Sequence, residues 1–136
     1  MKKATMTHVV IKVRDIEKSR RFYAKLCAVL GLKEVRSSES GFAYANGAFS
    51  VWVGKAKDVT RHRRGIVGYD HVAFSAPSRK QVDDLQKMLR SEKFRILYPA
   101  EKHPEFAPGY YSISFYDPDG TIMELLYLPK GKDSYG

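Results

Sequence analysis

Three residues of this 136-residue chain combine the side chains of metal ligands with positions in predicted strands. His8 and His71 each open a short strand-like segment, and the two segments, THVVI and DHVAF, repeat one pattern at an interval of 63 residues. Glu124 lies in the apolar run TIMELL, where an unpaired charge would be costly to bury. Two imidazoles and one carboxylate suit a divalent ion and leave coordination positions open for substrate or water.

Strand geometry predicts where these side chains point. Successive side chains alternate between the faces of a strand, so His8, Val10 and Lys12 share one face, and the other face carries Val9, Ile11 and Val13. The apolar face is expected to pack against a helix, which leaves His8 and, by the same parity, His71 on the concave face. We predict that His8, His71 and Glu124 bind one divalent ion, for which Mn, Fe, Ni, Zn and Co are all suitable. The alternative is that both histidines are hydrogen-bonded core residues and that Glu124 pairs with Lys12.

The elements that must position these residues also occur twice. Asp15 is the expected cap of a helix that ends at Gly31, and Ser78 with Gln81 forms a capping box for a second helix. Three further strands follow each helix. They are predicted at residues 33–38, 41–45 and 48–54 in the first copy and at residues 94–98, 110–116 and 121–128 in the second. Hairpin signals, Asn-Gly and Asp-Pro-Asp-Gly, join the last two strands of each copy.

This repeated βαβββ pattern predicts an α+β fold. Two paired modules are expected to form a curved, cup-like mixed sheet with the helices outside. The length suits one compact core, so we predict a single domain across residues 1–136. Within it we place module one at about residues 5–54, a basic linker at 55–65, module two at about 66–129 and a polar tail at 130–136.

Composition argues against several classes of protein. No run approaches the roughly 20 apolar residues of a membrane span, and no secretory leader is recognised. The chain has one cysteine, Cys27, so it cannot close an internal disulfide, and a cytoplasmic location is expected. The net charge of +9 comes from residues 1–65, yet their densest basic stretch, KAKDVTRHRR, has no aromatic residue to stack on bases. A linker is therefore favoured over a nucleic-acid site.

The motifs together resemble the vicinal-oxygen-chelate superfamily, which includes glyoxalase I, bleomycin-resistance proteins, extradiol dioxygenases and fosfomycin-resistance enzymes. The resemblance spans almost the whole chain. It rests on His8, on SRRFY leading to LGL, on DHVAF, and on FYDPDG followed by Glu124. It implies paired βαβββ modules around a metal-lined cup, commonly in a homodimer, and it maps His8, His71 and Glu124 onto the metal ligands of the family.

Some features depart from the pattern of glyoxalase I. That enzyme has a fourth ligand in the last strand of its first module, where the hairpin alignment places Val51, or Trp52 after a slip of one residue, and neither side chain binds a metal. Lys12 falls where glyoxalase I has an arginine that contacts glutathione. The three-ligand set looks more like that of extradiol dioxygenases and fosfomycin-resistance enzymes, although the loop at residues 101–109 lacks the serine-bearing cation loop of the latter.

The predicted function is a divalent-metal-dependent enzyme of the lyase, isomerase or dioxygenase type. Its substrate is expected to be a small molecule with vicinal oxygens, anionic compounds included, and neither nucleic acid nor membrane is an expected partner. The alternative is a metal-free protein that sequesters small molecules, as bleomycin-resistance proteins do. Lys12, Tyr44, His103 and Tyr111 are further candidates for substrate binding or catalysis. For His103 the alternative is an ordinary surface residue, and for the two tyrosines it is a core residue.

Overall fold

The computed structural model describes residues 2–59 and 65–129. The chain separates into two compact units, Met1–Thr60 and Arg61–Gly136. Each unit contains one of the two predicted modules. Residues 60–64 of the predicted linker and the predicted tail at 130–136 lie outside the described residues.

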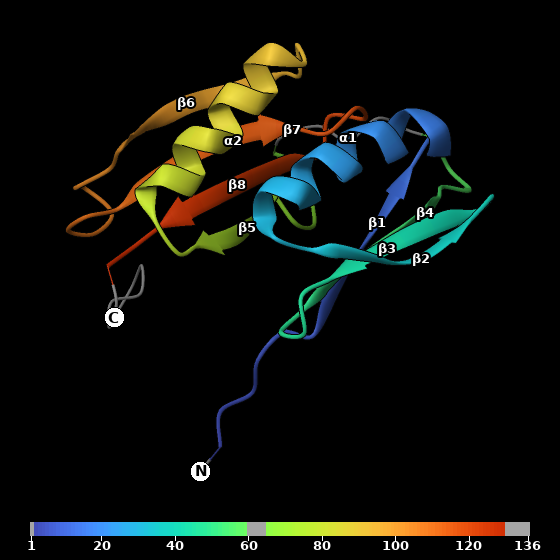
Figure 1. Cartoon of the computed structure of the whole chain (residues 1–136), viewed down its shortest axis with the longest axis horizontal. Helices are drawn as coiled ribbons and strands as arrows, with labels where there is room; N and C mark the ends of the chain where they lie inside the picture. The colour runs from blue at the N-terminus through green and yellow to red at the C-terminus, as the bar shows by residue number, and fades with distance from the viewer. Residues whose placement is uncertain (1, 60–64, 130–136) are drawn as a thin grey trace. The chain divides into compact units, whose positions relative to one another are not determined.

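The first module follows the predicted βαβββ order. Its elements are β1 (His8–Val13), α1 (Ile16–Leu30), β2 (Lys33–Ser38), β3 (Gly41–Ala45) and β4 (Ser50–Lys55). The strands form a mixed sheet in the order β1-β4-β3-β2, in which β1 runs parallel to β4 and the other neighbours are antiparallel. Figure 1 shows α1 lying along one face of this sheet.

The second module repeats this topology. Its elements are β5 (His71–Ala76), α2 (Arg79–Ser91), β6 (Ile96–Lys102), β7 (Tyr111–Tyr116) and β8 (Ile122–Tyr127). The sheet order is β5-β8-β7-β6, with β5 parallel to β8. The α+β fold of paired βαβββ modules is therefore confirmed, with one four-stranded sheet in each module. The largest boundary difference is β6, which continues to Lys102 rather than ending near residue 98.

Both helices begin as the sequence predicts. The side chain of Asp15 accepts a hydrogen bond from the N–H of Lys18 at 3.1 Å, and the side chain of Ser78 accepts one from the N–H of Gln81 at 3.3 Å. These bonds satisfy N–H groups that the first turn of a helix leaves without partners. Gly31 ends α1 with φ of 75°, the left-handed conformation that glycine adopts at little cost. Neither helix is long and apolar enough to cross a membrane.

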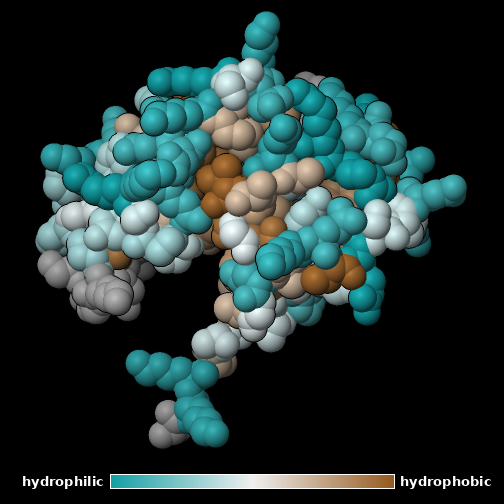
Figure 2. Space-filling view, in the orientation of Figure 1, coloured by the Kyte–Doolittle hydropathy of each residue, from teal (hydrophilic) through white to brown (hydrophobic). Residues whose placement is uncertain are grey.

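Each sheet buries one face beneath its helix, and we call the other face its open face. β1 and β5 have the same pattern of exposed and buried residues, with His8 and His71 exposed at the first position of each. The largest fully buried side chains are Tyr23, Phe22, Phe115, Leu26, Leu85, Leu89, Ile113, Met123 and Leu125. In Figure 2 hydrophilic side chains cover most of the surface over α1 and α2, as expected for helices that bury one side only.

Two turns connect the last strands of each module and fix their register. Asn46 and Asp117 each accept two backbone N–H bonds through one side-chain oxygen, at 2.9–3.1 Å. Gly47 and Gly120 have φ of 88° and 86°, which a residue with a side chain rarely adopts. Because a slip of one residue would move every side chain of a strand to the other face, the second turn determines which way Glu124 points.

Candidate functional site

A histidine and a glutamate meet on the open face of module two. His71 is the first residue of β5, and Glu124 of β8 is the register partner of Ala73, two residues further along β5. The Nε2 atom of His71 lies 3.7 Å from the Oε1 atom of Glu124. The histidine side chain is 43% exposed and the glutamate side chain 11% exposed. The structure thus brings two of the three predicted ligands together at a position that a small molecule can reach.

Asp70 determines which nitrogen of His71 is available. The Oδ2 atom of Asp70 lies 2.7 Å from Nδ1 of His71. A carboxylate only accepts hydrogen bonds, so Nδ1 carries the proton and the neutral ring has its lone pair on Nε2. In that form of the ring, the lone pair on Nε2 is directed toward Oε1 of Glu124. Histidines that bind metals are commonly oriented by a carboxylate in this way.

A buried tyrosine holds the other oxygen of Glu124. The hydroxyl of Tyr110 donates to Oε2 of Glu124 at 3.0 Å, and each of the two residues is 8% exposed. One carboxylate oxygen is therefore occupied, while the other faces His71. Tyr110 was not among the predicted site residues, although strand alternation could have identified it. Ser114 is the register partner of Glu124, and counting back by two reaches Ser112 and then Tyr110.

His8 occupies in module one the position that His71 occupies in module two. It is the exposed first residue of β1, and its Nδ1 atom lies 2.7 Å from the hydroxyl oxygen of Thr7. Each histidine is therefore bonded at Nδ1 by the side chain of the preceding residue, which leaves Nε2 for another contact. Neither histidine is a buried core residue. Lys12 lies on the same face of β1 as His8, also exposed.

The residue of module one that corresponds to Glu124 is Trp52. Glu124 is the partner of Ala73, and the residue that corresponds to Ala73 in β1 is Val10, whose partner is Trp52. Val51 instead lies on the helix-covered face and is 2% exposed, whereas Trp52 is 41% exposed. The alignment that placed Val51 opposite Glu124 is therefore wrong by one residue.

The position of the glycine in each loop explains this error. Ala45 pairs with Ser50 and Tyr116 pairs with Ile122. Residues 48 and 49 separate Gly47 from Ser50, whereas residue 121 alone separates Gly120 from Ile122, so an alignment on the two glycines is offset by one residue. Because a tryptophan side chain offers no metal-binding atom, module one supplies no counterpart to the carboxylate of Glu124.

Tyr44 is the register partner of Val51 and shares its face, which is the one covered by α1. Its hydroxyl donates to Oε2 of Glu34 at 3.1 Å, and its ring meets that of Phe42 edge to face, with centroids 6.1 Å apart. Burial, together with the bond to Glu34, raises the pKa of Tyr44 to about 12. Tyr44 is therefore a core residue, the second of the two predicted alternatives.

Tyr111 also lies on a helix-covered face. Its hydroxyl donates to Asp83 of α2, and the guanidinium of Arg79 lies 4.6 Å from the centre of its ring. The bond to Asp83 raises the pKa of Tyr111. Alternation along β7 gives the face of Glu124 to Tyr110, so Tyr111 does not share it.

His103 lies just beyond β6 in contact with the residues around Glu124. Its Nδ1 atom is 2.8 Å from Oε1 of Glu105, and its Nε2 atom is 3.6 Å from Oε1 of Glu101. The hydrogen bond from His103 lowers the pKa of the Glu105 carboxyl. The imidazole ring also meets the ring of Tyr110 edge to face at 5.9 Å. Tyr110 thus contacts both His103 and the carboxylate of Glu124.

The donor atoms of His71 and Glu124 fit a divalent ion. Metal–ligand distances of about 2.1 Å allow one ion to contact two donor atoms up to about 4.2 Å apart, and these two atoms are 3.7 Å apart. Metal binding requires the imidazole in its neutral form and the carboxylate in its ionised form. Within the described residues, no group of three His, Cys, Asp or Glu side chains forms a complete metal site.

Comparisons with known proteins agree with the fold and with the repeated motifs. The model of the Glyoxalase/Bleomycin resistance protein/Dioxygenase superfamily matches residues 5–125. The uncharacterized protein YqjT of Bacillus subtilis (strain 168) is 35% identical over 126 residues, which cover 89% of this chain and 97% of that protein.

Solved structures show the same arrangement. A candidate glyoxalase from Bacillus halodurans has a TM-score of 0.78 at 26% identity, with 93% of this chain and 97% of that chain covered. Lactoylglutathione lyase from Agrobacterium tumefaciens has a TM-score of 0.67 at 18% identity, with 92% and 94% covered, and this likeness concerns the fold alone. The match to the family model over most of its length shows that the chain belongs to the glyoxalase/bleomycin resistance protein/dioxygenase superfamily.

Proposed function

We propose that the protein is a divalent-metal-dependent enzyme that acts on a small substrate with two neighbouring oxygen atoms. The proposed ligands of the ion are His8, His71 and Glu124. Mn, Fe, Ni, Zn and Co all accept such a set, and three protein ligands leave positions for both substrate oxygens.

One observation carries this proposal. His71 donates its Nδ1 proton to Asp70 and presents Nε2 to Oε1 of Glu124, a buried carboxylate, across 3.7 Å. Two electron-pair donors in this arrangement stabilise each other only when a cation or a proton lies between them. The equivalence of His8 and His71 in the repeated modules supports His8 as the third ligand.

The roles of the surrounding residues follow from their contacts. When bound, the ion would act as a Lewis acid toward the negative charge that develops on an oxygen of the substrate, as an enolate or oxyanion forms. Asp70 and Thr7 orient the two imidazoles, and Tyr110 orients Glu124. His103, which contacts Tyr110, is the proposed acid–base residue beside the site. We also propose a cytoplasmic homodimer, on the basis of the single cysteine and the family.

Metal analysis tests the proposal directly. The protein is purified without chelator and without a nickel affinity tag, loaded in turn with Mn, Fe, Ni, Zn and Co, and its bound metal is measured. The wild-type chain is expected to hold about one ion, and His8→Ala, His71→Ala and Glu124→Ala are each expected to lose it while remaining folded. His103→Ala is the matched control, since it removes an imidazole that we do not place among the ligands.

Two outcomes would contradict the proposal. If all three variants retain the full amount of metal, the ligands are elsewhere. If the wild-type chain binds none of these ions and yet binds small molecules, the metal-free sequestering protein is the better assignment. A preferred ion, once identified, is then used in a screen of vicinal-oxygen substrates to determine the type of reaction.

A further inference from the structure

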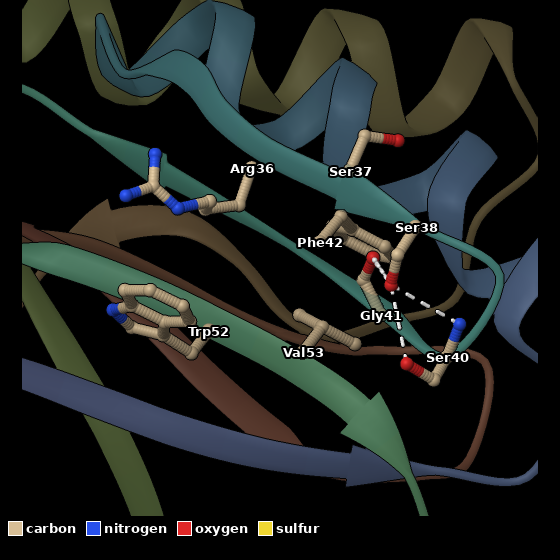
Figure 3. Close-up of a pocket in the computed structure, with 8 residues that line it drawn as sticks. All are labelled: Arg36, Ser37, Ser38, Ser40, Gly41, Phe42, Trp52 and Val53. Carbon is tan, nitrogen blue, oxygen red and sulfur yellow. Dashed lines mark hydrogen bonds between the residues drawn. The ribbon is translucent and has the colours of Figure 1, made fainter.

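Module one has a pocket on its sheet that the proposed metal ligands do not use. Its volume is about 300 Å³, and it lies over β2, β3 and β4. Figure 3 shows Arg36 and Trp52 at one end of the pocket and Ser38 and Ser40 at the other. The lining includes one cationic side chain, one indole ring and three serines, and it includes no acidic residue.

Small residues of the middle strand separate the side chains on either side of this pocket. Ala43 of β3 lies between Arg36 and Trp52 in the register of the sheet. Gly41, one row further along, lies between Ser38 and Gly54. A Cβ atom on Gly41 would come within 2.3 Å of a backbone oxygen, so this position accepts no side chain.

A β-bulge turns Arg36 onto this face. Glu34 pairs with Tyr44, which faces α1, whereas Arg36 pairs with Ala43, which is on the open face. In an uninterrupted strand, residues two apart share a face, so Arg36 would point toward the helix with Glu34. The register shift between them moves Arg36 to the open face instead. Bulges commonly re-aim a functional side chain in this manner.

The positive charge at the pocket has no acidic partner. Among the described residues, the guanidinium of Arg36 donates only to the carbonyl oxygen of Val35, at 2.9 Å, and forms no ion pair. The ammonium of Lys12 adds a second charge over Gly54, where it lies 3.0 Å from the place of a Cβ atom. A planar guanidinium with free N–H groups is suited to bind a carboxylate through two parallel hydrogen bonds.

The indole ring of Trp52 adds an apolar surface in a fixed orientation. Its N–H donates to the hydroxyl of Ser50 at 2.9 Å, and the residue is 41% exposed. Ser50 is the register partner of His8, so the indole and the proposed metal ligand occupy neighbouring rows of one face. Aromatic rings pack well against other planar groups.

We infer that this pocket binds a planar organic anion, with its carboxylate on Arg36 and its ring against Trp52. One consequence rests on the proposed function: the substrate would have vicinal oxygens at one end and a planar, negatively charged group at the other. The binding itself requires only module one, so it can be tested without metal.

The test uses the indole N–H of Trp52 as a reporter. The chain has one tryptophan, so ¹⁵N-labelled protein gives one indole N–H signal in a two-dimensional NMR spectrum. Benzoate is titrated into chelator-treated protein, and cyclohexanecarboxylate, benzamide and inorganic phosphate are the comparison probes. We expect benzoate to shift this signal saturably and to bind at least fivefold more tightly than the non-planar acid, the neutral amide and phosphate.

Two substitutions separate the charge at the pocket from charge in general. Arg36→Ala is expected to weaken benzoate binding at least tenfold and to leave the weak benzamide binding unchanged. Lys18→Ala removes a positive charge from an exposed position on α1 and is expected to have no effect. Three results would each overturn the inference. They are an indole signal that does not shift in benzoate, a comparison probe that binds as tightly as benzoate, and an Arg36→Ala variant that binds benzoate as the wild-type chain does.

Glu124→Ala distinguishes this inference from the proposed function. It is expected to bind benzoate as the wild-type chain does, although it has lost a metal ligand. A wild-type chain that binds benzoate but no metal would leave the pocket established and the proposed function refuted. A wild-type chain that binds metal but not benzoate would support the proposed function and overturn the inference about the pocket.

Discussion

The hydrogen bond from Tyr110 to Glu124 gives the sharpest test of the proposed site. Tyr110→Phe removes one hydroxyl group and leaves the aromatic ring in place. The lost bond is 3.0 Å long, ends on an oxygen of a carboxylate whose side chain is 11% exposed, and so cannot be replaced fully by water. A hydrogen bond to a charged group contributes about 1.5–3 kcal/mol.

The expected effect on metal binding follows from this energy. Every 1.4 kcal/mol corresponds to about a tenfold change in a dissociation constant. Tyr110→Phe should therefore weaken metal binding by roughly 10- to 100-fold, the range found when residues that orient a metal ligand are replaced. The physical reason is that Glu124 can rotate once Oε2 has lost its donor, so Oε1 is no longer held opposite His71.

Tyr111→Phe is a closely matched control. It removes the same atom from the adjacent residue, but that hydroxyl donates to Asp83 on the other face of the sheet. Metal affinity, measured by isothermal titration calorimetry, should be unchanged in this control, and thermal unfolding should show both variants folded. Equal metal affinity in Tyr110→Phe and the wild-type chain, or an equal loss in both variants, would refute the argument.

Three further predictions concern the register of β8, the equivalence of the two modules and the buried core. Inserting one residue between Asp119 and Gly120 should displace the glutamate of β8, so that metal binding is lost before the fold, as measured by metal titration and thermal unfolding. Val51→Glu should destabilise the fold by several kcal/mol because it places a charge beneath α1, whereas Trp52→Glu should leave the fold intact and tighten metal binding as a fourth ligand. Burial raises the pKa of Cys27 from 9.0 to about 12. The folded chain thus holds this proton more tightly than the unfolded chain, so the free energy of unfolding should fall as the pH rises above 9. Thiol reagents at pH 8 should label Cys27 only after unfolding.

The strands and helices were predictable because local signals agree with the topology. Asp15, Ser78 and the Asn-Gly turn are all used in the structure as the sequence indicates. The faces of β1 and β5 also follow from simple alternation. The histidine–glutamate contact in module two could be anticipated on the same basis, since a charge in an apolar strand needs a partner.

The pairing register of the strands could not be predicted where a loop or a bulge adds a residue. One more residue follows the turn glycine in module one than in module two, so the counterpart of Glu124 is Trp52 and not Val51. The bulge between Glu34 and Arg36 brought a cation to the open face that simple alternation assigns to the helix side. Neither extra residue has a distinctive local signal, because it is the partner strand that determines where a pairing is offset.

The two modules share a backbone plan and differ in the side chains that it presents. At equivalent positions of the repeat, Glu124 provides a carboxylate in module two and Trp52 provides an indole in module one. The carboxylate has to be oriented, and Tyr110 does so from the neighbouring strand. The indole is held by a bond to Ser50 and lies beside the small residue Ala43. On our two proposals, module two contributes the carboxylate ligand and the residue that orients it, and module one contributes the surface for a planar anion. In the proposed assignments, the residue at this position of the last strand acts together with Tyr110 in module two and with Arg36 in module one.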